Sequence, residues 1–378
     1  MTIETHRPLP ADRHLAFWPA ACLAVRGGVA ACDRCANACP VGVLKVGADG
    51  TALVGDCLHC GRCAAACPSG ALVAKGFDEA RLPSGNLPVA IECWKVPREI
   101  AGEQAVRVPC LGGLALTRLI EWLVEAGSRP LRLVDRGWCA NCAAGTDGFA
   151  GAAILAALSP WLSASGLPPA HWPKQSEKPL PKALMPREIP SAERQIAMGR
   201  RAFFGRLAKE IARSERPVEA PAGPRAALRR TRCPLPAHER FLAALTQLAA
   251  TQGRPLPPRA LPRLEVSPAC RDHGLCASSC PTDALVIRDG EKGRQWRFSS
   301  ARCTGCGRCV AVCPEQALRL GEGGQFEEVV LRTVSLTSCL ECGRDFVPQA
   351  AEHICPQCLA QRALAQSMFA PGPNVAGQ

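Results

Sequence analysis

The chain has 378 residues, of which 24 are cysteines, and a formal net charge of +12. Only 4% of the residues are aromatic and tyrosine is absent, which argues against a platform of aromatic rings for single-stranded nucleic acid. The sequence shows neither an apolar run long enough to cross a membrane nor a secretory signal, so we expect a cytoplasmic protein. In that reducing compartment cysteines bind metals rather than form disulfides, and about six metal–thiolate centres of roughly −2 each would cancel most of the positive charge. The basic character therefore does not require a nucleic-acid partner.

Two cysteine-rich blocks, residues 18–76 and 263–322, contain the same motif, C-x2-C-x2-C-x3-C-P. In the first block the motif consists of Cys57, Cys60, Cys63 and Cys67, and in the second of Cys303, Cys306, Cys309 and Cys313. Three closely spaced thiolates of such a motif bind one [4Fe–4S] cluster, and the fourth, turned away by the proline, reaches a second cluster. Two occurrences favour iron–sulfur modules over a pair of zinc knuckles.

Both blocks resemble the bacterial-type dicluster ferredoxins. The resemblance implies a small pseudo-symmetric fold in which two antiparallel β-hairpins and two short helices surround two [4Fe–4S] clusters. It also implies that each block carries a second, partner motif, and that the protein transfers electrons.

The partner motif of the first block is altered at its first position. Cys32, Cys35 and Cys39 are retained, but Val29 stands where the first cysteine is expected, and Cys22 lies upstream of it. Cross-ligation then assigns Cys22, Cys32, Cys35 and Cys67 to one cluster and Cys39, Cys57, Cys60 and Cys63 to the other. The alternative is that Cys22 is a buried apolar residue and that this cluster is three-iron or absent.

Residues 87–170 alternate between strand and helix patterns, which predicts a small α/β domain. Its four cysteines lie at two strand ends and in a C-x2-C loop: Cys93, Cys110, Cys139 and Cys142. The arrangement is similar to thioredoxin-like [2Fe–2S] domains and to the small iron–sulfur (delta-like) subunit of methanogen hydrogenases, which implies a [2Fe–2S] cluster. A zinc site, or a Cys139/Cys142 pair in disulfide exchange, is the alternative.

Residues 171–262 are rich in proline and charge, so we expect a linker. Within it, an amphipathic helix is predicted to begin after Pro190, with Ser191 as its N-cap. Its apolar face would consist of Ile196, Phe203, Phe204, Leu207 and Ile211. Cys233, which follows the helix, has no partner motif and is expected to be a plain thiol.

The partner motif of the second block retains Cys270, Cys276 and Cys280 but has His273 at its second position. An imidazole ligand removes one negative charge from a cluster and raises its reduction potential, as in Rieske centres. Cross-ligation assigns Cys313 to this altered site and leaves Cys280, Cys303, Cys306 and Cys309 for an ordinary low-potential cluster. The alternatives for the altered site are a [3Fe–4S] cluster with His273 merely nearby, or ligation by Asp272.

Residues 334–362 contain a separate group in the spacing C-x2-C-x12-C-x2-C: Cys339, Cys342, Cys355 and Cys358. Two such knuckles make a closed tetrahedral site of four thiolates, and the segment resembles a zinc ribbon. A rubredoxin-like iron centre has the same ligands and remains the alternative.

The sequence thus predicts an α+β protein in which two dicluster ferredoxin modules flank a small α/β domain, followed by a zinc ribbon. We expect up to four [4Fe–4S] clusters, a [2Fe–2S] cluster and zinc. We expect an electron carrier rather than an enzyme, a subunit or accessory of a cytoplasmic oxidoreductase, with redox proteins as partners and no nucleic acid. The alternative is an iron–sulfur maturation or regulatory factor that binds a client apo-enzyme.

Overall fold

The computed structural model describes residues 7–9, 12–27, 32–47, 49–145, 148–184, 231–290, 293–348 and 353–369. The chain divides into two compact units, Met1–Ala260 and Leu261–Gln378. The amphipathic helix expected after Pro190 lies outside the described residues. Within the described parts of the chain, no helix is both long and apolar enough to span a bilayer.

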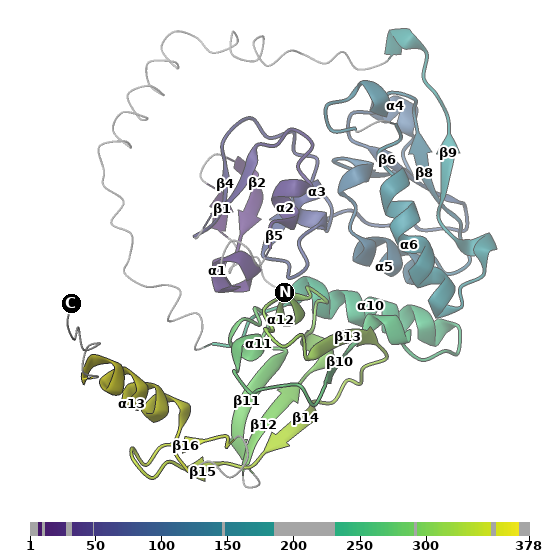
Figure 1. Ribbon diagram of the computed structural model, residues 1–378. Helices are drawn as coiled ribbons and strands as arrows, with labels where there is room; N and C mark the ends of the chain where they lie inside the picture. The colour runs from purple at the N-terminus through teal and green to yellow at the C-terminus, as the bar shows by residue number, and fades with distance from the viewer. Residues whose placement is uncertain are drawn as a thin grey trace, which may run out of the picture. The chain divides into compact units, whose positions relative to one another are not determined.

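The first unit begins with the first cysteine block, which folds as two small antiparallel sheets and short helices (Figure 1). One sheet has the order β1-β2-β5, formed by Arg7–Leu9, Asp12–Phe17 and Leu72–Ala74, and the other is the hairpin of β3 (Leu44–Gly47) and β4 (Gly50–Leu53). The helices are α1 (Leu23–Gly27), α2 (Arg34–Asn37) and α3 (Arg62–Ala65). Leu15, Phe17, Leu44 and Leu72 are buried between these elements. We call this part the first module.

The remainder of the first unit is built on a four-stranded sheet whose strands are all parallel. Its order is β7-β6-β8-β9, formed by Val106–Val108, Val89–Cys93, Leu131–Asp135 and Lys174–Glu177. The helices are α4 (Arg98–Ala101), α5 (Leu116–Ala126) and α6 (Ala152–Ser165), with the short 3-10 helices η4 (Leu111–Gly113) and η5 (Cys139–Asn141) at strand ends. The predicted α/β alternation is thus present in the structure.

The region expected to be a linker, residues 171–262, contributes a strand and a long helix to this unit, and the strand extends the sheet of the α/β region beyond residue 170. Strand β9 consists of polar residues at the edge of the sheet, which explains why it has no apolar strand pattern. Helix α10 (Pro236–Thr251) packs against α5 (Figure 1) and buries Leu242, Leu245 and Leu248. That spacing is an amphipathic pattern that the proline-rich surroundings concealed.

An ion-pair network fixes α10 to the rest of the first unit. Arg240 lies 2.5 Å from a carboxylate oxygen of Glu121 on α5 and 2.8 Å from one of Asp78, which follows the first module. The side chains of Arg240 and Asp78 are both exposed to solvent, so we expect the network to fix the position of α10 more than to stabilise the fold.

A second ion pair is buried at the ends of β6 and β8. Arg136 donates to both carboxylate oxygens of Glu92, at 2.7 and 3.0 Å, and to the carbonyl oxygens of Ile100 and Lys178. Glu92 is 1% exposed and Arg136 is 9% exposed. Because Glu92 directly precedes Cys93, this bidentate pair fixes the backbone that carries the cysteine edge of the sheet.

The second unit repeats the element order of the first module. Strand β10 (Pro262–Val266) pairs with β13 (Leu318–Glu322) as β2 pairs with β5, and the hairpin of β11 (Leu285–Gly290) and β12 (Gly293–Phe298) corresponds to β3 and β4. Helices α11 (Leu275–Ser278) and α12 (Arg308–Ala311) occupy the positions of α2 and α3 in this order. Strand β14 (Val329–Val334) adds a third strand beside β12, so this part, the second module, extends beyond the predicted boundary at 322.

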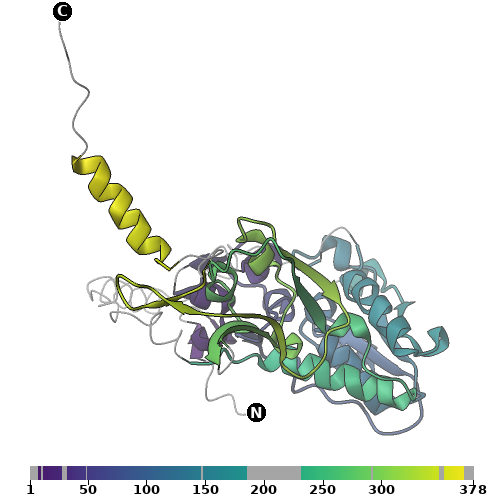
Figure 2. The same ribbon diagram turned by 60° about the horizontal axis from the view of Figure 1, so that its bottom comes forward.

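The C-terminal segment follows β14. It consists of a short hairpin, β15 (Thr337–Ser338) and β16 (Asp345–Phe346), and the helix α13 (Pro356–Phe369), drawn in yellow in Figure 2. Among the described residues of this segment, the buried ones are Phe346 and three of the four cysteines, so the core that they form consists mainly of sulfur.

Substitution of Glu92 by alanine should destabilise the α/β sheet by about 3–5 kcal/mol, because Arg136 would keep a buried charge without its partner. Native-state hydrogen exchange of the β6 and β8 amides measures this loss. The double variant Glu92→Met/Arg136→Met should recover most of it. The matched control is Glu125→Ala, which removes an exposed glutamate of α5. Equal protection of these amides in Glu92→Ala and Glu125→Ala would show that the buried ion pair of Glu92 with Arg136 does not stabilise the sheet.

Candidate functional sites: groups of cysteines

The first module brings its cysteines together as two crossed sets. One pocket is lined by Cys22, Cys32, Cys35 and Cys67, and a second by Cys39, Cys57, Cys60 and Cys63. Each pocket therefore takes its fourth cysteine from the motif that supplies the other pocket. These are the two sets that cross-ligation predicts from the sequence. Cys22 is the fourth cysteine of the first set, whose motif has valine in place of its first cysteine.

The thiols of both pockets are difficult to ionise without a cation. Burial raises the pKa of Cys35 to about 12, and the neighbouring Cys67, Cys22 and Cys32 add to that effect. Burial likewise raises the pKa of Cys63, with contributions from Cys60 and Cys57. Four thiolates in one buried pocket become favourable only when a metal centre compensates their charge. The donor sets therefore fit iron–sulfur clusters, whose iron ions supply that charge.

A buried hydroxyl lies beside one cysteine in each module, two residues after the last cysteine of a motif: the second motif in the first module and the altered first motif in the second module. Ser69 Oγ lies 3.7 Å from Cys67 Sγ, and Thr282 Oγ1 lies 3.6 Å from Cys280 Sγ. Both follow the proline of their motif and are at most 2% exposed. Hydrogen bonds to ligand sulfurs help to set a cluster's potential, so these hydroxyls are candidate tuning groups, which sequence reasoning missed. The signal was the repeated C-P-[S/T].

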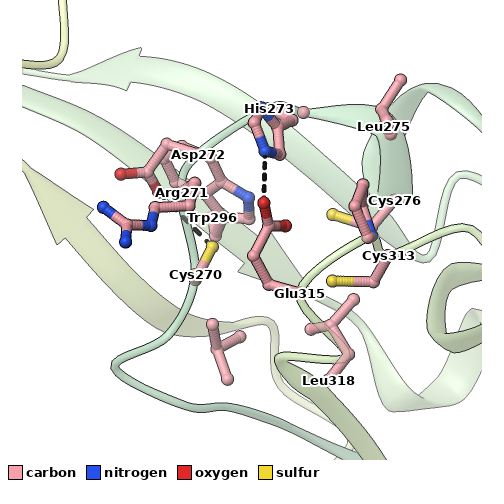
Figure 3. Close-up of a pocket in the computed structure, with 13 residues that line it drawn as sticks. Cys270, Arg271, Asp272, His273, Leu275, Cys276, Trp296, Cys313, Glu315 and Leu318 are labelled. Atoms are coloured by element: carbon pink, nitrogen blue, oxygen red, sulfur yellow. Dashed lines mark hydrogen bonds and ion pairs between the residues drawn. The ribbon is translucent and has the colours of Figure 1, made fainter.

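The altered site of the second module has both cysteine and non-cysteine candidates around one pocket (Figure 3). The predicted donors that line it are Cys270, His273, Cys276 and Cys313, together with Asp272. His273 Nε2 lies 2.6 Å from Glu315 Oε1. The carboxylate of Asp272 is only 4% exposed, forms an ion pair with Arg332 at 3.3 Å, and accepts a hydrogen bond from Cys270 Sγ at 3.6 Å.

The backbone places His273 where the intact motifs have a cysteine. The residues on either side of that position adopt positive φ in three motifs: His59 and Gly61, Asp272 and Gly274, and Gly305 and Gly307. Asp272 has a φ of 60° and Gly274 a φ of 72°, within a few degrees of their counterparts. The same turn therefore carries Cys60, His273 and Cys306, although the residue type differs.

The other set of the second module consists of Cys280, Cys303, Cys306 and Cys309. Burial raises the pKa of Cys303 to about 12 and that of Cys309 to about 11, and Cys280 is the first of the charged neighbours in both cases. Because Cys280 comes from the altered motif, this set is crossed in the same way as those of the first module.

The four cysteines of the α/β region lie at the carboxyl edge of its parallel sheet. Cys93 ends β6, Cys110 follows β7, and Cys139 and Cys142 follow β8 in and after η5. Burial raises the pKa of Cys93, and the neighbouring Cys139 and Cys142 contribute to that rise. Lys95 Nζ lies 3.2 Å from Cys142 Sγ, which supplies a positive charge that sequence spacing does not reveal. We call this group the middle site.

The C-terminal cysteines form a much tighter group. The sulfur atoms of Cys339, Cys342, Cys355 and Cys358 all lie within 4.8 Å of one another. The Cys355 amide donates to Cys339 Sγ at 3.2 Å, and this hydrogen bond is the main reason that the pKa of Cys339 lies below its usual value. Four sulfurs at this separation fit a single tetrahedral ion such as zinc.

Comparison with family models agrees with the two modules. Residues 30–72 and residues 269–317 each match a model described as a 4Fe-4S dicluster domain. The first match excludes Cys22, whereas the second includes His273 and all the cysteines of its module. No curated protein matches the chain. The chain thus carries two 4Fe-4S dicluster ferredoxin domains and a four-cysteine cluster near its C-terminus.

Replacement of Cys22 by serine should lower the iron content by up to about four atoms per chain, because a hydroxyl is a poorer donor than a thiolate for a [4Fe–4S] cluster. Metal analysis after anaerobic purification measures the loss of iron per chain, and the zinc content should not change. Cys233→Ser is the matched control, because Cys233 is also buried and packs near Cys32 but does not line the pocket. Full iron content in Cys22→Ser would show that Cys22 is only a packing residue.

Proposed function

We propose that this chain is a multi-cluster iron–sulfur electron-transfer protein that serves as a subunit or accessory of an oxidoreductase. The observation that carries the proposal is the crossing of cysteine sets in both modules. Each pair of sites shares its motifs, so two redox centres are held side by side in each ferredoxin domain. Bound [4Fe–4S] clusters supply one-electron redox chemistry, and the protein sets their potentials through burial, charge and hydrogen bonds to sulfur.

For the middle site we propose a [2Fe–2S] cluster. Its support is the convergence of four thiols from three strand ends, with Lys95 beside Cys142. Burial raises the pKa of Cys110 and of Cys139, and the guanidinium of Arg62 offsets a small part of that rise. These two cations offset part of the roughly −2 charge that four thiolates give an oxidised cluster. A disulfide-exchange pair would leave the positions of Cys93 and Cys110 unexplained.

For the altered site we propose ligation by His273, with Glu315 as its positioning residue. A carboxylate bonded to one ring nitrogen of a ligand histidine fixes the tautomer and leaves the other nitrogen for the metal. The short contact between His273 Nε2 and Glu315 supports this arrangement, and that hydrogen bond lowers the pKa of Glu315. Asp272 is the weaker candidate, because Arg332 and Cys270 already occupy its carboxylate.

For the C-terminal group we propose a structural zinc ion, because zinc favours a closed tetrahedral set of four thiolates. The segment also presents apolar side chains to solvent: Leu340 is 78% exposed, Leu359 42% and Leu364 62%. This exposure favours a second function, docking of a client protein, as expected for a maturation or regulatory factor.

A stepwise reductive titration under anaerobic conditions separates the two functions. An electron carrier with five cluster sites should take up about four to five electrons per chain reversibly and pass them to a viologen or cytochrome. A maturation factor should instead bind its client tightly and show little turnover with these acceptors. Uptake of only one or two electrons would contradict the carrier function.

Replacement of His273 by cysteine should lower the potential of one cluster, because thiolate adds a negative charge that imidazole lacks. Glu315→Gln should shift the same potential by less, since the amide preserves a hydrogen bond to the ring but not the charge. A redox titration monitored by electron paramagnetic resonance (EPR) resolves the shift. Glu322→Gln, a change on the exposed end of β13, serves as the control. An unchanged titration of His273→Cys would exclude ligation.

A further inference from the structure

We propose that electrons pass between the first module and the middle site through the buried cluster of side chains that contains Cys60 and Cys110. The inference rests on the proposed function, because it requires clusters at both sites. It assigns to the α/β region a redox role in direct continuity with the ferredoxin domain, so the region is more than a spacer between the two modules.

The two cysteines belong to one buried cluster of side chains. Cys60 is 8% exposed and Cys110 is 7% exposed, and both pack with Ala144 and Ala150. The flanking residues Leu58, Cys139 and Cys142 pack against the same cluster. Electronic coupling between two redox centres falls less steeply with distance through packed protein than across a water-filled gap. Electron transfer is therefore faster through packed side chains. This cluster provides such a path between the sites.

The backbones approach each other as closely as glycine allows. A Cβ atom added to Gly113 in η4 would lie 1.9 Å from the carbonyl oxygen of Cys60 and 2.7 Å from the ring of Phe77. A Cβ atom on the adjacent Gly112 would lie 2.6 Å from the guanidinium of Arg62. Neither glycine has a positive φ, so close approach, and not turn geometry, is what requires glycine here. A larger residue at Gly113 would separate the sites.

Arg62 joins the two sites electrostatically. It lies on α3 of the first module, and its Nε donates to the carbonyl oxygen of Ala144 at 3.1 Å. Ala144 belongs to the same buried cluster as Cys60 of one site and Cys110 of the other, so this hydrogen bond holds the positive charge of Arg62 next to both. Its Nη2 is buried and has no hydrogen-bond partner in the part of the chain that the structure describes. A sulfur acceptor of a bound cluster would satisfy that donor.

The transfer involves one electron and breaks no bond. An external low-potential one-electron donor reduces the site of Cys39, Cys57, Cys60 and Cys63. That site is then oxidised by one electron as the middle site is reduced by one. Because Arg62 is bonded to Ala144 in the cluster that contains Cys60 and Cys110, its charge stabilises the added negative charge on either site. The site containing Cys22 shares its two motifs with the site of Cys39, Cys57, Cys60 and Cys63. The first unit therefore contains a series of three sites, which ends at the middle site.

The test is EPR of the full chain, purified anaerobically and reduced in steps with dithionite. The middle-site signal is identified as the one that Cys139→Ser removes. Its microwave power saturation is then measured when the neighbouring [4Fe–4S] site is oxidised and again when it is reduced. Spin–spin coupling across the contact should make the signal harder to saturate, by severalfold, in the fully reduced protein.

The variants then test the contact itself. Gly113→Ala should reduce the change in saturation severalfold, whereas Gly47→Ala, in a part of the first module with room for a methyl group, should leave it intact. If Gly113→Ala fails to fold, the comparison of the two reduction states of the unaltered chain still decides. A middle-site signal with identical saturation in both states would overturn this inference and leave the proposed function standing. Absence of any [2Fe–2S] signal would overturn both the middle-site cluster and the inference.

Discussion

The structure depends on one constraint, the compensation of buried thiolate charge. In the two modules and at the middle site, burial raises the pKa of cysteines, so the thiols cannot lose their protons together unless a metal centre balances them. The crossing of the fourth cysteine in each module follows from the same constraint, since it makes each site depend on both motifs. Folding of a module and assembly of its two clusters are therefore coupled.

Much of the candidate site was predictable because ligand spacing and proline position are local. The intact motifs, the crossed sets, and the approach of Cys22 to its pocket all follow from spacing and from the expected pseudo-symmetry. The C-terminal group was equally predictable from the sequence, because two C-x2-C knuckles allow few arrangements of their four sulfur atoms. The convergence of the four cysteines of the middle site was predictable because parallel strands have their carboxyl ends at the same edge of a sheet.

The rest could not be predicted, because it depends on contacts between distant segments or on patterns that their surroundings conceal. Strand β9 is polar and at the edge of its sheet, and α10 follows a proline-rich stretch, so both were assigned to a linker. The cations of the middle site come from elsewhere in the chain: Lys95 reaches Cys142, and Arg62 belongs to the first module. The pairing of His273 with Glu315 also joins segments from two motifs. Such long-range partners determine how each centre is tuned, whereas local spacing determines where it lies.

The most direct test of iron–sulfur occupancy is Mössbauer spectroscopy of protein labelled with ⁵⁷Fe and purified without oxygen. Most of the iron should give the delocalised pattern of [4Fe–4S] clusters, with about sixteen such atoms per chain from four sets of ligands. Colourless protein, with zinc alone bound to the cysteines of both modules, would contradict iron–sulfur occupancy.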